Sequence, residues 1–412
     1  EPLYNYYKYY LYTHKDCVME RIQHISNHLT MSDVSSTVTQ QQPPLNSNMS
    51  NRAILYQEYD NGCRKIILNR EEALHSLTLE MILEMYRLLK LYENDPKVKL
   101  VMLVSSGGKA FCSGGDLKQF ITRREVAHEL LSAEYKMDYL IHTYNKPVVS
   151  IVDGIVMGGG VGVSIHAEYR VLTEKVVWAM PENSIGYFTD VGTNYYTSRM
   201  TGGVGLYLSM TGSRVGLKDA MRLSIGTHHV KSEHVPMLVD DLCEKEINDR
   251  RQIQFILNMW RKSVPIGQHA NASNMTPLEI NRESIQRCFD WRMTGATTAE
   301  SIIELVKQET ATNPEWANAT LKKLDHACPL SVKVTLRAIL ESSTLPIDEV
   351  FKMDNRVGRY LMGSLDNVLV GVQGALINRK GRPAWWPATL QETSDDLVDQ
   401  CFKHLEDSKE LD

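Results

Sequence analysis

The chain has 412 residues, of which 43% are hydrophobic and 23% are charged, as is typical of water-soluble globular proteins. Its net charge of −5 argues against a dominant nucleic-acid-binding surface, so direct RNA contact is expected to be minor if it occurs. No run of eighteen apolar residues occurs, so neither a membrane span nor a membrane partner is expected.

Residues 1–50 differ in composition from the rest of the chain. Tyrosines crowd positions 4–12, and a Gln/Pro run at 40–44 is followed by a Ser/Asn-rich stretch. Such a segment cannot bury a core by itself, so we predict a low-complexity extension that packs on its own domain or on another protein. With three Lys/Arg and four Asp/Glu it does not resemble an Arg-rich transit peptide, and any leader is expected upstream.

From residue 53 the pattern alternates between strands and helices. Two β-rich runs, 53–59 and 64–68, flank Asp60-Asn61-Gly62, which is a strong hairpin signal. The alternation predicts an α/β fold with crossover connections. The remaining predicted elements are helices over 76–94, 129–144 and 161–168, and strands over 100–104, 147–152, 169–172 and 176–179.

From about residue 240 the pattern becomes helical. Asn313-Pro314 is typical of a helix start, with Asn as the cap and Pro in the first position, and the acidic tail 392–412 is predicted to be a solvated amphipathic helix. The predicted organisation is an extension over 1–50, a core over 51–240 and a helical region over 241–412. The other helices expected here cover 247–262, 298–309, 314–326 and 331–342.

The cysteines and histidines do not indicate a metal site or a disulfide scaffold. The seven cysteines are scattered, and no pair has CxxC spacing, which fits a reducing compartment. His24 and His28 have HxxxH spacing but lie in the extension, without a carboxylate or thiol to complete a ligand set. No metal is therefore expected.

Two glycine turns, Gly114-Gly115 and Gly158-Gly159-Gly160, each follow a predicted strand and precede a helix. Glycine lets the backbone approach a ligand closely, and a helix start adds positive potential. Backbone N–H groups in this setting stabilise the negative oxygen that forms when a thioester is attacked. Each turn alone is more simply explained by packing. With the acids of Met180-Pro-Glu182 and Asp190 downstream, the combination favours an acyl-thioester site.

Three motifs carry a resemblance to a known family. Lys-Ala-Phe-Cys-Ser-Gly-Gly-Asp at 109–116, Met-Gly-Gly-Gly-Val-Gly at 157–162 and Met-Pro-Glu at 180–182 resemble the crotonase (enoyl-CoA hydratase/isomerase) superfamily. Within it, the segments 179–182 and 188–192 are similar to the 3-hydroxyisobutyryl-CoA hydrolase family. The similarity runs from about residue 53 to about 405. It implies a crotonase-like spiral of ββα units with a helical C-terminal region.

The resemblance also implies roles for individual residues. Gly115 and Gly159 would supply the N–H groups of an oxyanion hole, and Glu182 would be the catalytic carboxylate, acting directly or through water. Asp190 would hold the substrate hydroxyl or the water.

Substrate contacts are implied for Glu134, Gly114 and Gly158. The substrate would be a short 3-hydroxyacyl-CoA of valine breakdown in the mitochondrial matrix. Coenzyme A is part of that substrate, so no separate cofactor is expected. Hydratases of the superfamily carry a second catalytic glutamate where this chain has Gly162, which disfavours hydration.

The chain departs from the family around the second acid. Thr189 replaces the family's proline before Asp190, and Thr193-Asn194 replace glycines. Threonine resists positive φ, so we expect a displaced or obstructed loop. Two functions therefore stay open. One is a 3-hydroxyisobutyryl-CoA hydrolase-like enzyme. The other is a structural protein of the mitochondrial ribosome small subunit that derives from such a hydrolase and engages protein partners through residues 1–50.

Overall fold

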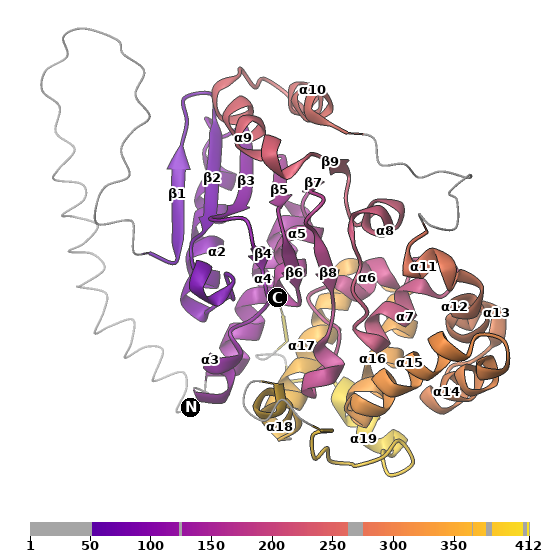
Figure 1. Ribbon diagram of the computed structural model, residues 1–412. Coiled ribbons are helices and arrows are strands. Elements are labelled where there is room, and N and C mark those ends of the chain that lie inside the picture. Colours follow the sequence, from indigo (N-terminus) through magenta and orange to yellow (C-terminus); the bar gives the residue numbers. More distant parts are fainter. Residues whose placement is uncertain are drawn as a thin grey trace, which may run out of the picture. The chain divides into compact units, whose positions relative to one another are not determined.

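The computed structural model describes residues 52–122, 126–262, 275–364, 366–375, 381–406 and 410–411. The extension over 1–50, and with it the predicted partner contact, lies outside the described residues. Among those described, no helix combines the length and the hydrophobicity needed to cross a membrane. The fold is α/β, as predicted (Figure 1).

The larger sheet has six strands in the order β1-β2-β3-β5-β7-β9. Its first two strands form the antiparallel hairpin predicted from Asp60-Asn61-Gly62, and every later pair is parallel. Gly62 has φ +89°, which suits glycine at the end of the turn. The strands are β1 Ile54–Glu58, β2 Cys63–Leu68, β3 Leu100–Ser105, β5 Val148–Val152, β7 Tyr169–Leu172 and β9 His228–His229.

The smaller sheet has three parallel strands in the order β4-β6-β8. The sequence predicted β8 (Val177–Ala179) but neither β4 (Ala110–Cys112) nor β6 (Ile155–Met157), because a strand of three residues shows no alternation of its own. β4 and β6 end just before the two glycine turns. This sheet therefore places both turns at the same edge.

The helices of the first half follow the prediction with small shifts at their ends. α2 (Leu79–Asn94) begins three residues later than expected, where the hydroxyl of Thr78 accepts a hydrogen bond from the N–H of Met81. α4 (Ala127–Thr143) packs beside α2, and α5 (Gly159–Ile165) begins within the triple glycine. The short α3 covers Leu117–Thr122.

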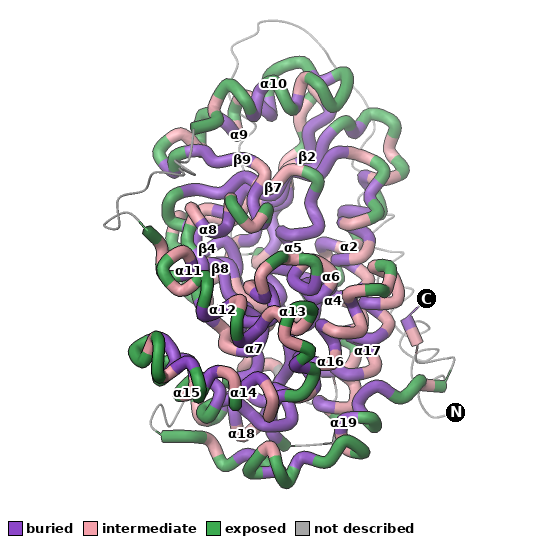
Figure 2. The backbone as a smooth tube through the Cα atoms, turned by 90° about the vertical axis from the view of Figure 1, so that its right-hand side faces the viewer, coloured by how far each residue is buried: buried purple, intermediate pink, exposed green. Residues whose placement is uncertain are grey.

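Two helices, one that spans the predicted boundary at residue 240 and one that follows it, pack on the larger sheet rather than on the other C-terminal helices. α9 (Val235–Glu244) and α10 (Arg250–Trp260) share an apolar cluster with the strands, and Figure 2 shows α10 with buried positions between exposed ones. The buried members include Leu238, Leu242, Ile253, Ile256 and Leu257 from the helices, and Leu100, Met102, Val149, Ile151 and Val171 from the strands.

The remaining helices pack mainly on one another, and some of them also contact α4 and the turn η3 (Glu182–Ile185). α15 has the predicted bounds. Asn313 is the N-cap residue and Pro314 begins the helix, as predicted, but the Asn313 side chain donates to Asn281 and Ser284 and makes no capping hydrogen bond to its own helix. Among its described residues, the tail is helical over α19 alone. The elements are α6 Thr193–Thr197, α7 Val204–Thr211, α8 Leu217–Arg222, α11 Pro277–Ile280, α12 Arg282–Phe289, α13 Trp291–Thr294, α14 Ala299–Gln308, α15 Pro314–His326, α16 Pro329–Ser342, α17 Ile347–Ser364, α18 Asn367–Gln373 and α19 Asp395–Phe402, with 3-10 turns η1 Glu71–Ala73, η3 Glu182–Ile185, η4 Ser232–His234 and η6 Glu309–Ala311.

Candidate active site

A cavity of about 140 Å³ lies at the edge of the smaller sheet where the glycine turns meet. Every site residue predicted from the sequence lines it, although these residues come from five separate segments. Its lining is mostly apolar, with backbone and carboxyl groups as the polar elements. The predicted residues that line it are Gly114, Gly115, Glu134, Gly158, Gly159, Glu182 and Asp190.

The two glycine turns touch each other. A Cβ at Gly114, which has φ +103°, would lie 3.1 Å from the Met157 carbonyl oxygen and 3.5 Å from the Gly159 nitrogen. A Cβ at Gly158, which has φ +51°, would lie 2.9 Å from Oε1 of Glu182. Both positions therefore require glycine, for the backbone conformation and for the close approach.

Among the described residues, the backbone N–H groups of Gly115 and Gly159 at the cavity have no protein acceptor. Gly158 donates to the carbonyl of Ala179 at 3.4 Å, which anchors the second turn to β8. In the part of the chain that the structure describes, the N–H groups of Gly115 and Gly159 make no such hydrogen bond. Gly159 is the first residue of α5, and the first N–H groups of a helix have no partner within it. Both amides are thus available to an oxygen in the cavity.

Glu182 opens the turn η3 directly after Pro181 and is 7% exposed. Its Oε2 has no hydrogen-bond partner among the described residues. Burial, with the charge of Asp190 as the next cause, raises the pKa of Glu182 well above its ordinary value. The environment therefore favours the protonated form when the cavity is empty, and gives the ionised form high basicity.

Glu134 reaches the cavity from α4 and is 3% exposed. A Cβ at Gly159 would lie only 2.0 Å from its Oε1, so this carboxyl group rests against the second glycine turn. Burial first, and then the charge of Asp190, raises the pKa of Glu134 to about 8. Glu134 is therefore a second carboxyl group that holds a proton near neutral pH.

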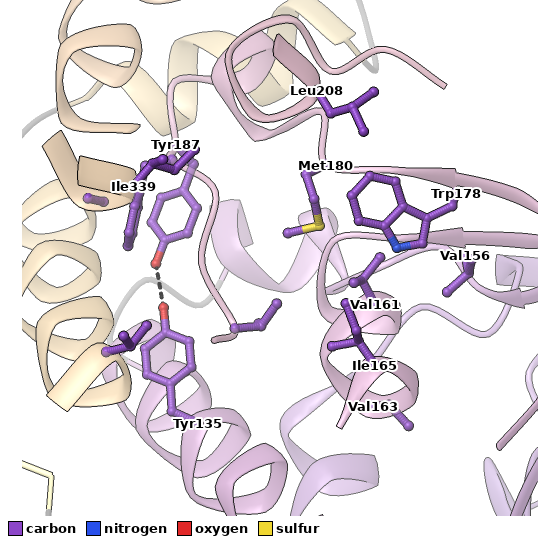
Figure 3. Packing of buried hydrophobic residues seen from close by; sticks show 14 of the residues in the cluster. Tyr135, Val156, Val161, Val163, Ile165, Trp178, Met180, Tyr187, Leu208 and Ile339 are labelled. Atoms are coloured by element: carbon purple, nitrogen blue, oxygen red, sulfur yellow. Dashed lines mark hydrogen bonds between the residues drawn. The ribbon is translucent and has the colours of Figure 1, made fainter. Parts of the chain in front are cut away.

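Asp190 completes the polar lining, and two tyrosines that the sequence did not single out surround it. The Tyr135 hydroxyl donates to Oδ2 of Asp190 at 2.6 Å, and it lies 3.0 Å from the Tyr187 hydroxyl. Figure 3 shows these two hydroxyl groups facing each other, one from α4 and one from the segment after η3. Burial raises the pKa of Asp190 to about 7, against the lowering effect of the hydrogen bond from Tyr135.

The altered loop does not obstruct the cavity, so the expected obstruction is corrected. Thr193 is fully buried as the first residue of α6 and does not line the cavity. The residues at positive φ are Val191 and Gly192, at +53° and +68°. Thr189 and Asn194 are also fully buried, and the Asn194 amide donates to the carbonyl of Thr189. The side chains of Thr189, Thr193 and Asn194 therefore stabilise the loop from the protein interior and not from the cavity side.

The site is acidic and contains no compensating cation. No Lys, Arg or His is among the residues that line the cavity in the described part of the chain. Without a cation, a buried carboxylate pays its full desolvation cost, which is why the carboxyl groups retain protons. Within the described ranges, no group of three or more His, Cys, Asp or Glu side chains is arranged to hold a metal ion.

The sequence matches known proteins over most of its length. Residues 63–402 match the enoyl-CoA hydratase/isomerase family. The mitochondrial 3-hydroxyisobutyryl-CoA hydrolases of Gallus gallus and Homo sapiens are each 36% identical to it, over 348 and 349 residues, which cover 84% of this chain and 87% of those proteins. A probable 3-hydroxyisobutyryl-CoA hydrolase of Arabidopsis thaliana is 34% identical over 88% of this chain and 94% of that protein.

Two solved structures share the architecture. A carnitinyl-CoA dehydratase from Mycobacterium thermoresistibile superposes with a TM-score of 0.77 and 29% identity, covering 88% of this chain and 99% of that one. An enoyl-CoA hydratase from Rhodobacter sphaeroides gives a TM-score of 0.74 and 26% identity, covering 88% of this chain and 100% of that one. The predicted crotonase-like fold with a helical C-terminal region is thereby confirmed.

Proposed function

The chain belongs to the enoyl-CoA hydratase/isomerase family, and from that premise we propose that it hydrolyses the thioester of 3-hydroxyisobutyryl-CoA. One observation carries the proposal: Gly115 and Gly159, whose N–H groups have no acceptor among the described residues, and the buried Glu182 line a single cavity. The curated relatives described above are named as hydrolases of this thioester and cover most of the chain.

The backbone and the carboxyl group of the cavity would have different roles in the reaction. The thioester oxygen would accept hydrogen bonds from the N–H groups of Gly115 and Gly159, which stabilise its developing negative charge. The Glu182 carboxylate would either attack the carbonyl carbon or remove a proton from an attacking water. The carbon–sulfur bond then breaks, and the thiolate takes up a proton and leaves as coenzyme A. Where Glu182 has attacked the carbonyl carbon, water next hydrolyses the anhydride so formed and frees the Glu182 carboxylate. Water supplies the oxygen and the protons of the products.

Two further acids would orient the substrate. Asp190, with Tyr135 as its donor, would hold the substrate hydroxyl or the attacking water. Glu134 would contact the acyl group next to Gly159, and Gly114 and Gly158 would let the thioester approach the backbone closely. We propose that no separate cofactor takes part, since coenzyme A arrives as part of the substrate.

Hydration is a weaker candidate for this site. The hydratases that the chain resembles use a second catalytic glutamate in the helix after the triple glycine, and that position, 162, is glycine here. A Cβ there would lie 2.2 Å from Oδ2 of Asp138 and 2.9 Å from Cβ of Val191, so no larger side chain fits without rearrangement. Asp138 itself does not line the cavity.

The relatives' names also bear on location. The vertebrate hydrolases are named mitochondrial, which supports a mitochondrial location for this chain; we propose the matrix as the compartment. The alternative of a ribosomal small-subunit protein gains no support, because none of these relatives is named as one. Residues 1–50, whose composition suggested this alternative, lie outside the described residues.

The test is release of free thiol from 3-hydroxyisobutyryl-CoA by the purified protein. Glu182→Gln keeps the size of the side chain and removes its basicity, so kcat should fall by about 10³-fold or more. Glu315→Gln changes an exposed glutamate on α15 and should leave kcat unchanged. A parent protein that releases no more thiol than Glu182→Gln would contradict the proposal. In a separate assay with the corresponding enoyl-CoA as substrate, loss of its absorbance without thiol release would favour hydration.

A further inference from the structure

The turn that carries Asp190 has an unusual backbone. Val191, the next residue, has φ +53°, in the left-handed region that β-branched residues seldom adopt. Gly192 follows at φ +68° and Thr193 then begins α6. Asp190 is thus followed directly by two residues in the left-handed region, of which Val191 is strained. Such a conformation persists only where the surroundings hold it.

Asp354, from α17, contacts the turn on one side. Its Oδ2 accepts a hydrogen bond from the N–H of Gly192 at 2.8 Å, across 162 positions of sequence. Asp354 is fully buried, and its Oδ1 has no hydrogen-bond partner among the described residues. Burial, and next the charge of Asp190, raises the pKa of Asp354 well above its ordinary value. A buried acid beside other acids is costly, so its retention here calls for a specific contact.

His166, at the end of α5, contacts the turn on the other side. Its Nε2 lies 2.8 Å from the carbonyl oxygen of Val191. A carbonyl can only accept, so Nε2 carries the hydrogen. Burial lowers the pKa of His166 to about 3, which leaves the ring neutral. Its Nδ1 then accepts from the Tyr196 hydroxyl at 3.3 Å, which fixes the ring's orientation.

The same neighbours leave no room for the turn to relax. A Cβ at Gly192 would lie 2.7 Å from Cζ of Phe351 and 2.8 Å from Cε1 of His166. Phe351 and Asp354 are three positions apart on α17 and so share one face of that helix. The turn is thus held between α17 and the end of α5. The single peptide group between Val191 and Gly192 is hydrogen-bonded on both sides, its carbonyl to His166 and its N–H to Asp354.

We propose that Asp354 is a positioning residue for the hydrolysis: by holding the Gly192 N–H it fixes the strained turn and thereby aims Asp190 at the substrate. The proposal deepens the proposed function and rests on it. Asp354 does not line the cavity, so it acts on the reaction only through Asp190. What the contact needs is an acceptor oxygen, not a charge.

The test compares two replacements of Asp354 that have almost the same shape. Asp354→Asn keeps an acceptor oxygen and should retain kcat within about threefold, whereas Asp354→Leu lacks the acceptor and should lower kcat by about tenfold or more. Because Leu fills the volume of a buried acid, the second variant should stay folded. In an Asp190→Asn background, Asp354→Leu should cause no further loss. If Asp354 had a purely structural role, the losses of kcat in Asp190→Asn and Asp354→Leu would add in the double variant.

A second variant removes the strain itself. Glycine adopts φ near +53° freely, so Val191→Gly should keep the turn folded when Asp354 is changed. Within the Val191→Gly background, Asp354→Leu should cost less than about twofold in kcat. A loss as large as in the parent background would overturn the proposal, as would equal losses for Asp354→Asn and Asp354→Leu.

Amide hydrogen exchange separates this proposal from the proposed function. The Gly192 amide should exchange about tenfold faster in Asp354→Leu than in the parent or in Asp354→Asn, whether or not the protein turns over the thioester. A parent protein without thiol release, but with this pattern of exchange, would contradict the hydrolase proposal and still support the role of Asp354 in holding the Gly192 N–H. Unchanged exchange in Asp354→Leu would contradict that role of Asp354.

Discussion

Burial is the main cause of the raised carboxyl pKa of the three acids that line the cavity. Glu182, Glu134 and Asp190 are ordinary carboxyl groups in the sequence, but desolvation raises the pKa of each one in the fold. For Asp190 and Glu134 the values of about 7 and about 8 lie in the range where an enzyme works at neutral pH. The protonation state of the site should therefore control its activity.

The pH dependence of kcat/KM tests this. The proposed reaction needs ionised carboxyl groups, so kcat/KM should rise with pH between about 6 and 8. Tyr135→Phe removes the hydrogen bond that lowers the pKa of Asp190, so the rising limb should move to higher pH. Tyr139→Phe alters the same helix without contacting Asp190 and serves as the control. A pH profile that is flat over this range would contradict the assignment.

Gly159 is the residue where backbone and acid approach most closely. An added Cβ would lie 2.0 Å from Oε1 of Glu134, so Gly159→Ala should displace one of them and lower kcat by about 10²-fold. The double variant Gly159→Ala/Glu134→Ala removes the clash and should recover thermal stability without recovering activity. Gly216→Ala, at a position with open space around it, is the matched control. Calorimetry and thiol release together decide the outcome.

At the scale of elements, α17 supports the site by one face. Phe351, Asp354 and Gly358 follow one another at helical spacing on the side that meets α4 and the Asp190 turn. Gly358 lets the helix approach the tyrosine pair, since a Cβ there would lie 2.4 Å from the Tyr187 hydroxyl. α17 is therefore part of the site although only Met362, one turn later, lines the cavity.

Alanine substitutions along α17 separate packing from helix propensity. Gly358→Ala should push the Tyr187 hydroxyl away from Tyr135 and lower kcat by about tenfold, despite the gain in helix propensity. Gly363→Ala gains the same propensity on the same helix, and its Cβ would meet only the end of the His128 ring. It should keep kcat and raise the melting temperature. Equal activity in both variants would contradict the role given to Gly358.

Across the whole molecule, five buried acids form one electrostatic group. They come from α4, η3, the turn before α6 and α17, and burial raises the pKa of each member. An acid whose pKa is raised in the folded state binds more protons there than in the unfolded chain, so stability falls as pH rises through the folded value. The members are Glu134, Asp138, Glu182, Asp190 and Asp354.

The sign of this effect gives a stability prediction. The stability that Glu134 and Asp190 contribute should be fully present below about pH 4, near the ordinary carboxyl values, and should be lost as the pH rises through their folded values of about 8 and about 7. Glu134→Gln removes one ionisation and should raise the free energy of unfolding at pH 8 by roughly 4 kcal/mol, with little change at pH 4. Denaturant unfolding at both values measures it, with Glu315→Gln as control. A larger gain at pH 4 would contradict the sign.

The sequence by itself determined the parts that depend on near neighbours in the chain. Asp60-Asn61-Gly62 gives a hairpin and Pro314 starts a helix through local backbone preferences. The glycine turns, with Glu182 and Asp190, could be recognised because their spacing carries a family motif. All seven residues that the motif predicted line one cavity. Their catalytic and binding roles stay predictions.

Only the tertiary structure brought Tyr135, His166 and Asp354 to Asp190. These residues lie on three helices separated by long stretches of sequence, and no local pattern marks a buried acid that accepts a distant N–H. The same holds for the strained Val191 and for the raised carboxyl pKa values. Burial, close approach and pKa shifts arise from what surrounds a residue in space, so they are decided when the chain packs.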